Sequence, residues 1–277
     1  MAGSLVRAIW RRLPVGLRRG VAHTGLSLLA PPLPARPDLP AGAPFVVVGF
    51  LTSPSGLGQS ARLAMKALAA DGHDVYGIDL SRHFFEIAEC VRVDFRDGRG
   101  VRGPARVVIN INAPYLKYVF HLLGRGFLRD KEVIAYWAWE LPRAPDQWRE
   151  GFARAHRIAV PSHFVANALT ALGPTPPIVV APHPVALEDL PRLPPRTAPI
   201  SREAPFTVLS SFNVASGFER KNPLALIAAF RDAFGERDDV RLLLLATGAE
   251  HYPEGKARLT EAAVRDARTE LTTEPLD

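Results

Sequence analysis

Short apolar runs alternate with periodic segments between about residues 45 and 250. The runs rich in β-branched residues predict buried strands, and segments with apolar residues every three or four positions predict helices. The predicted strands are Phe45–Leu51, Val75–Leu80, Val107–Ile111, Val133–Trp139, Arg157–Val160, Ile178–Ala181, Phe206–Phe212 and Arg241–Ala246. Because strands and helices alternate, we predict an α/β fold whose N-terminal domain is Rossmann-like, with a parallel sheet covered on both faces.

Two proline-rich segments divide the chain. Six prolines lie in Pro31–Pro44 and five in Leu190–Pro205, and both stretches are typical of stiff linkers. We therefore predict an arm (1–30), a linker (31–44), a Rossmann-like domain (45–190), a second linker (191–205) and a partial C-terminal domain (206–277). The last has only 72 residues, near the lower limit for a domain, so we expect it to be cut short or completed elsewhere.

The positive charge is concentrated in the arm. The net charge is +6, and residues 1–30 contribute +5 through five arginines and no acidic residue. This pattern, mixed with Leu5, Ile9 and Trp10, predicts an amphipathic helix that rests on anionic lipid, and a disordered basic leader is the alternative. Nucleic-acid binding is not favoured, because the basic surface is confined to the arm.

Cysteine usage and hydropathy indicate the compartment. Cys90 is the one cysteine in the chain, so no disulfide can form within it, which fits a reducing environment. No run approaches the roughly 20 apolar residues of a membrane span. We expect a cytoplasmic protein, with the arm contacting the inner face of the membrane.

Two adjacent cations, Arg220 and Lys221, precede a predicted helix. Asn222 is a natural N-cap and Pro223 a natural first helical residue. The apolar face that follows comprises Leu226, Ile227, Phe230, Ala233 and Phe234. Because a helix N-terminus already carries partial positive charge, the arrangement indicates an anion site for a phosphate group. The alternative is that both side chains extend into water.

A glycine loop follows the first strand. Gly56 and Gly58 lie between a strand and a helix, where the backbone can approach a phosphate closely. The letters also match G-x-G-x-x-A, and Asp79 follows Gly58 by 21 residues, as in dinucleotide-binding sites. Four residues separate the strand from Gly56, however, whereas that fingerprint needs a tight turn. A loop whose glycines serve only the turn is the third interpretation.

A third candidate is the block Tyr136-Trp137-Ala138-Trp139-Glu140. Aromatic residues and a carboxylate at the end of a strand suit a sugar, and Glu140 can orient a hydroxyl or accept its proton. The alternative is that both tryptophans are core residues and Glu140 pairs with Arg143. His163 and His183 each follow a strand, and we interpret both as surface or packing residues.

Three blocks resemble retaining glycosyltransferases of family 4, which have the GT-B fold of two Rossmann-like domains. They are GFLTSPSGLGQSARLAMKAL, YWAWELPRAPDQWREGFARAHRIAVPSHFVANAL and SSFNVASGFERKNPLALIAAFRDAF. The resemblance spans residues 45–250. It implies a nucleotide-sugar donor as substrate, a glycan, polysaccharide or lipid-linked hydroxyl acceptor, retention at the anomeric carbon, and no metal or other cofactor.

The resemblance also implies roles for particular residues. Lys221 resembles the lysine that steadies the donor diphosphate, with Arg220 and Asn222 beside it, and Gly56 and Gly58 resemble the loop that approaches the diphosphate from the other side. On the acceptor side it places Trp137, Trp139 and Glu140. We expect Arg220, Lys221 and Glu140 to be the catalytic residues, and the two loops to meet at one cleft.

Two departures from the family leave other functions open. Many members have an arginine where this chain has Ser216, and no pair of glutamates follows Lys221 in a glycine-rich context. The chain is therefore also compatible with a catalytically incomplete binding module of the family. An NAD-dependent enzyme that uses GLGQSA and Asp79, and a membrane-surface adaptor that uses the arm, are the remaining alternatives.

Overall fold

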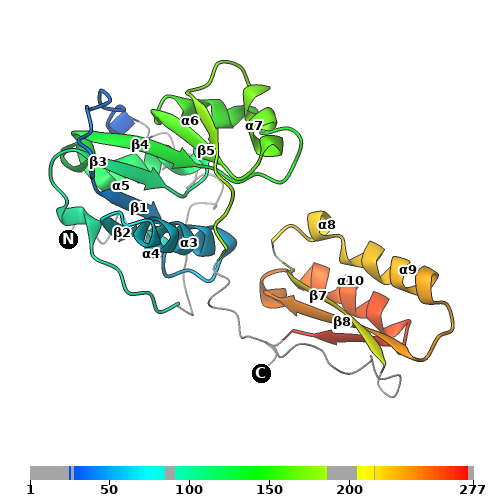
Figure 1. Cartoon of the computed structure of the whole chain (residues 1–277). Helices are drawn as coiled ribbons and strands as arrows, with labels where there is room; N and C mark the ends of the chain where they lie inside the picture. Colours follow the sequence, from blue (N-terminus) through cyan, green and yellow to red (C-terminus); the bar gives the residue numbers. More distant parts are fainter. Residues whose placement is uncertain (1–24, 26–27, 85–90, 186–204, 215, 274–277) are drawn as a thin grey trace, which may run out of the picture. The chain divides into compact units, whose positions relative to one another are not determined.

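The computed structural model describes residues 25, 28–84, 91–185, 205–214 and 216–273. The predictions for the arm, for Cys90 and for most of the second proline-rich segment fall outside these residues. The chain divides into two compact units, Met1–Pro191 and Arg192–Asp277 (Figure 1). Each unit is described by itself.

Unit 1 is built on six parallel strands in the order β2-β1-β3-β4-β5-β6. The strands are β1 (Phe45–Gly49), β2 (Val75–Asp79), β3 (Ala105–Ile109), β4 (Lys131–Tyr136), β5 (Arg157–Val160) and β6 (Ile178–Val180). The β-branched residues of β1, β3 and β5 are buried, as the continuous apolar runs predict, whereas Val179 of β6 is 46% exposed. The predicted α/β class and the Rossmann-like sheet of unit 1 are confirmed.

Helices cover both faces of this sheet. One face packs on α5 and α7 through a core that includes Val107, Phe120 and Leu169, whereas the other packs on α3 through Val47 and Ala61. The helices of unit 1 are α3 (Gly56–Ala70), α4 (Ser81–Phe84), α5 (Leu116–Leu128), α6 (Arg149–Phe152) and α7 (His163–Thr170). Short 3-10 turns lie at Gly98–Gly100, Ala113–Tyr115 and Asp146–Trp148.

The proline-rich segment 31–44 contacts the sheet of unit 1. The His156 ring accepts a hydrogen bond from the Val133 amide through Nδ1 (2.8 Å), so its Nε2–H donates to the Pro34 carbonyl oxygen (2.9 Å). Arg36 pairs with the buried Glu132 at 2.7 Å. The fixed backbone of the prolines lets a segment without regular secondary structure hold these two contacts.

Unit 2 contains a three-stranded parallel sheet in the order β7-β8-β9. Its elements are β7 (Phe206–Asn213), α8 (Phe218–Lys221), α9 (Pro223–Phe234), β8 (Val240–Thr247), a 3-10 turn (Ala249–His251), α10 (Pro253–Val264) and β9 (Thr269–Thr272). Side chains of α9 and α10, among them Phe230 and Leu259, pack on the alternate β8 residues Val240, Leu242, Leu244 and Ala246.

Several predicted boundaries are wrong by a few residues. β1 ends at Gly49 and β4 at Tyr136, and the apolar residues that follow them, among them Leu51 and Trp137, are buried in loops. Strand β9 was not predicted, since TELT is short and three of its four residues are polar. Within the described residues, no helix combines the length and hydropathy needed to cross a membrane.

Candidate functional site

The strand order of unit 1 creates a topological switch point. β1 pairs with β2 on one side and with β3 on the other, so the crossover connections leave β1 and β3 in opposite directions. Ligands of open parallel sheets bind at the carboxyl ends of the strands next to such a point. In this chain those ends lead into the loop 50–55 and into Asn110, which makes this edge the candidate site of unit 1.

The loop between β1 and α3 is fixed by its own side chains. Ser55 caps α3, since its hydroxyl oxygen accepts a hydrogen bond from the Gly58 amide at 3.2 Å. Arg62, one turn into the helix, reaches back and donates to the carbonyl oxygens of Leu51 (2.9 Å) and Ser53 (2.8 Å). The loop is therefore preorganised, and Arg62 adds a cation that the sequence analysis did not single out.

The two glycines of this loop have different surroundings. A Cβ atom on Gly58 would lie 2.4 Å from the Ser53 carbonyl oxygen and 2.5 Å from that of Phe50, so only glycine fits there. A Cβ atom on Gly56 would meet nothing within 4 Å. Gly58 thus serves the close packing of helix on loop, whereas the open space at Gly56 is where a ligand can approach the backbone.

Asp79 is engaged by its own chain. Its carboxylate accepts hydrogen bonds from the hydroxyls of Thr52 (2.8 Å) and Ser81 (2.6 Å) and from the Ser81 amide (3.1 Å). Burial raises the pKa of Asp79, but the hydrogen bonds from Ser81 and Thr52 outweigh it and leave the pKa below its ordinary value. Asp79 therefore anchors the glycine loop, a role that does not require a dinucleotide.

Asn110 lies at the switch point and is fully buried. Among the described residues, neither Nδ2 nor Oδ1 of its amide finds a hydrogen-bond partner. Buried polar atoms are normally paired, so this unpaired amide marks the candidate edge as a place where the fold leaves a donor and an acceptor unused. The sequence signal was weak, a single polar residue after the apolar run of β3.

Three further side chains meet at the same edge. The Nδ1 atom of His183 lies 3.1 Å from the Ser60 hydroxyl and 3.2 Å from the Tyr136 hydroxyl, and Tyr136 donates to the Ala181 carbonyl oxygen at 2.9 Å. Burial raises the pKa of Tyr136 to about 12 and lowers the pKa of His183. Both side chains are therefore neutral near pH 7. The interpretation of His183 as a surface or packing residue did not include these hydrogen bonds.

The tryptophan–glutamate block follows β4. Trp137 is fully buried, with its ring centroid 5.7 Å from that of Trp148 and 5.9 Å from that of Phe152, so it supports the edge from inside the core. Trp139 is half-buried and donates its Nε1–H to the Arg143 carbonyl oxygen at 2.9 Å. Glu140 is exposed at the end of this block. Glu140 is thus the most exposed residue of the block.

The predicted surroundings of Arg220 and Lys221 need correction. Both lie in α8, a four-residue helix between Gly217 (φ 81°) and Asn222 (φ 49°), and not in an irregular loop. Asn222 adopts the left-handed conformation and its side chain does not cap α9, although Pro223 is the first residue of that helix as predicted. The left-handed residue separates two helices that would otherwise be continuous. Both cations still precede α9 directly, and both are exposed.

Arg220 lies beside a pocket at the carboxyl ends of β7 and β8. The pocket has a volume of 350 Å³ and is lined by Val214, Gly217, Phe218, Glu219, Arg220, His251 and Tyr252. The Arg220 guanidinium folds back and donates to the Ser216 carbonyl oxygen at 2.8 Å. The guanidinium therefore lies over Ser216. At this position, many members of the family that the sequence resembles have an arginine.

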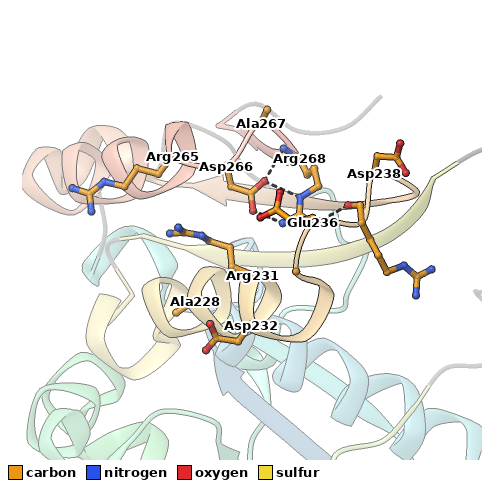
Figure 2. A pocket seen from close by; sticks show the side chains of 11 residues that line it. Ala228, Arg231, Asp232, Glu236, Asp238, Arg265, Asp266, Ala267 and Arg268 are labelled. Carbon is orange, nitrogen blue, oxygen red and sulfur yellow. Dashed lines mark hydrogen bonds and ion pairs between the residues drawn. The ribbon is translucent and has the colours of Figure 1, made fainter.

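A second pocket in unit 2, of 670 Å³, lies at the other end of the sheet (Figure 2). Its wall includes the bidentate pair of Arg268 and Asp266, with nitrogen–oxygen distances of 3.0 and 2.8 Å. This pair closes the turn that leads into β9. The pocket opens at the amino ends of β8 and β9, where parallel sheets do not bind their ligands, so we interpret it as structural.

The predicted site residues therefore form two groups. Gly56, Gly58 and Glu140 lie at the carboxyl edge of unit 1, and Arg220 and Lys221 at that of unit 2. The meeting of these groups in one cleft stays a prediction. Among the residues that the structure describes, no group of three histidine, aspartate or glutamate side chains has the arrangement of a metal site.

No known family profile matches the sequence, and no curated protein matches it. Among solved structures, the chain is similar to the glycosylation associate protein (Gap123) complex from Streptococcus agalactiae, with a TM-score of 0.33 and 12% identity. The match covers 70% of this chain and 40% of the Gap123 complex chain, so this chain spans less than half the length of that chain. Function is accordingly inferred from the chain's own residues.

Proposed function

We propose that this chain belongs to the retaining glycosyltransferases of family 4 and moves a sugar from a nucleotide-sugar to a hydroxyl acceptor. The observation that carries the proposal is the exposed pair Arg220–Lys221, which follows a parallel strand and directly precedes a helix N-terminus, with Arg220 lining a pocket. Cations and a helix end placed there suit a diphosphate. The GT-B fold, the retention and the acceptor class rest on the motif resemblance.

The charges define the chemistry of this proposal. As the bond to the anomeric carbon breaks, negative charge grows on the departing nucleoside diphosphate. Arg220 and Lys221 stabilise that charge, and Arg220 is held in position by its hydrogen bond to Ser216. In unit 1, Gly56 offers backbone in open space for a phosphate, and Glu140 orients the acceptor hydroxyl.

The proposal is tested by replacing the lysine. Lys221→Ala is expected to lower the rate of sugar transfer by about 100- to 1,000-fold, the usual effect of losing one preorganised group that stabilises transition-state charge. Lys256→Ala, an exposed lysine on α10 of the same unit, is the matched control and should keep the parent rate. Transfer is followed with a panel of labelled nucleotide-sugars and methyl glycosides. Equal rates for parent and Lys221→Ala would remove the assigned role.

A prior binding measurement separates catalysis from binding alone. Titration calorimetry with the same nucleotide-sugars should give heat with at least one member, and the heat should weaken in Lys221→Ala. Binding without transfer would favour the binding-module alternative. No heat with any of the nucleotide-sugars would contradict the proposed donor class.

A further inference from the structure

Four polar residues gather on one face of the sheet at the switch point of unit 1. We call Ser60, Asn110, Tyr136 and His183 the polar cluster. In the register of the sheet, Val108 of β3 lies opposite Ile134 of β4. Two residues further along each strand, Asn110 and Tyr136 therefore stand side by side on the face that α3 covers. Ser60 belongs to the first turns of α3, and His183 follows β6.

The hydrogen bonds of the cluster determine where the His183 proton lies. The single proton of the Tyr136 hydroxyl is donated to the Ala181 carbonyl oxygen at 2.9 Å, so toward His183 the phenol oxygen can only accept. A hydrogen bond between the two therefore requires that the Nδ1 atom of His183, 3.2 Å away, carries the proton and donates it. The Ser60 hydroxyl, 3.1 Å from the same nitrogen, can accept a share of this bond.

In a neutral imidazole only one nitrogen carries hydrogen, so Nε2 retains its lone pair. Ser60 and Tyr136 are 6% and 7% exposed, whereas His183 is exposed. The buried side of the ring is thus fixed by two oxygens, and the open side presents an acceptor. These two hydrogen bonds hold the ring in one orientation, as the hydrogen-bond partners of metal-binding histidines do.

We propose that His183 is a binding residue whose Nε2 atom accepts a hydrogen bond from a hydroxyl of the ligand held at the carboxyl edge of unit 1. The ligand class is a polyhydroxylated molecule such as a sugar, and in this respect the inference rests on the proposed function. Asn110 supplies the second observation, because its buried amide has both donor and acceptor atoms without partners among the described residues. A sugar hydroxyl is both donor and acceptor, and matches such a pair of groups.

The tautomer is tested first and needs no ligand. Long-range nitrogen–proton NMR of the imidazoles, with His183→Gln used for assignment, should find the His183 proton on Nδ1. Tyr136→Phe removes the phenol oxygen that accepts this proton, so the proton should move toward Nε2. A parent protein with the proton on Nε2 would overturn the inference.

Chemical modification then tests the exposed lone pair. Diethyl pyrocarbonate acylates an unprotonated imidazole nitrogen, so His183 should react at Nε2, and the reaction should slow in Tyr136→Phe. UDP-glucose, GDP-mannose and methyl glycosides serve as protecting probes. At least one of them should protect His183 but not His163, an exposed histidine after β5 of the same unit. Protection of neither histidine by any probe would count against the ligand.

Affinity supplies the third readout. His183→Ala should weaken binding of the protecting probe by about tenfold, as expected for one neutral hydrogen bond, and His183→Gln should restore part of it. His163→Ala should bind as the parent does. If the chain transfers sugar and His183→Ala works at the parent rate with parent affinity, the inference fails while the proposed function stands. If no sugar is transferred but a methyl glycoside still protects His183, the inference stands and the proposed function fails.

Discussion

The spacing of Asp79 from the glycine loop matches a dinucleotide-binding motif, but the spacing does not reveal the hydrogen-bond partners of its carboxylate. Its distance from Gly58 fits a carboxylate that binds a ribose. In the structure, two hydroxyls donate hydrogen bonds to its carboxylate. Thr52 lies in the loop after β1, and Ser81 lies at the start of α4, just after β2. These short-range contacts depend on side-chain rotamers, which no spacing rule specifies. The residue is better explained as the anchor of the glycine loop.

This role predicts a pH-dependent loss of stability. The pKa of Asp79 is lowered in the folded chain, so its contribution is present above the ordinary aspartate pKa of about 3.9 and is lost as the pH falls through the folded value. Asp79→Asn should lower the free energy of unfolding by about 1 kcal/mol at pH 7, since hydrogen bonds to a half-buried carboxylate are partly screened by water. The deficit should shrink by pH 3.

Urea unfolding followed by tryptophan fluorescence measures this effect, because all four tryptophans precede residue 149 and the described ones report on unit 1. The exposed Asp94 is the matched control, and Asp94→Asn should leave the unfolding midpoint unchanged at both pH values. A deficit of Asp79→Asn that is as large at pH 3 as at pH 7 would argue against the ionised carboxylate as the anchor.

At the scale of the element, the first turn of helix α3 contains two glycines with different surroundings. Gly58 is closely packed against the loop, whereas Gly56 faces open space. Gly58→Ala should cost about 1–3 kcal/mol of stability, because its methyl group would collide with the carbonyl oxygens of Ser53 and Phe50. Gly56→Ala should be neutral or slightly stabilising, since it adds a better helix former in open space. Fluorescence-detected urea unfolding compares the two variants.

The same pair also tests the ligand. If a phosphate approaches the backbone at Gly56, then Gly56→Ala should weaken nucleotide-sugar binding even though it folds as well as the parent. In Gly56→Ala, the affinity measured by calorimetry should fall while the stability measured by unfolding does not fall. In Gly58→Ala, both should fall. Unchanged affinity in Gly56→Ala would locate the ligand elsewhere.

The elements that were predicted well are those with strong, local signals. The apolar runs mark seven of the eight predicted strands to within two residues at each end, with β4 shifted further. Three features had no such signal. The left-handed turn at Asn222, the short strand β9 and the meeting of Ser60 with His183, 123 residues apart, depend on tertiary contacts that override local preference.

At the scale of the whole molecule, the two units differ in how completely their sheets are covered. Unit 1 has helices on both faces, as expected of a doubly wound sheet. In the described part of unit 2, α9 and α10 pack on one face of β8, through Leu242 and Leu244. The opposite face carries Leu243, and beside it on β7 Leu209 is 57% exposed. Unit 2 thus depends on a one-sided core.

Substitution of two adjacent leucines of β8 tests whether one face of the sheet in unit 2 contributes more to stability than the other. Leu244 is fully buried, so Leu244→Ala should destabilise unit 2 by about 2–5 kcal/mol, the range for a core leucine. Leu243 points to the other face, and Leu243→Ala should cost under about 1 kcal/mol, because less apolar surface leaves the core. Unit 2 contains no tryptophan, so amide hydrogen exchange of β8 in the full chain is the appropriate measurement. An equal loss of protection in both variants would mean that the Leu243 face is covered as tightly as the Leu244 face, and that the core of unit 2 is two-sided.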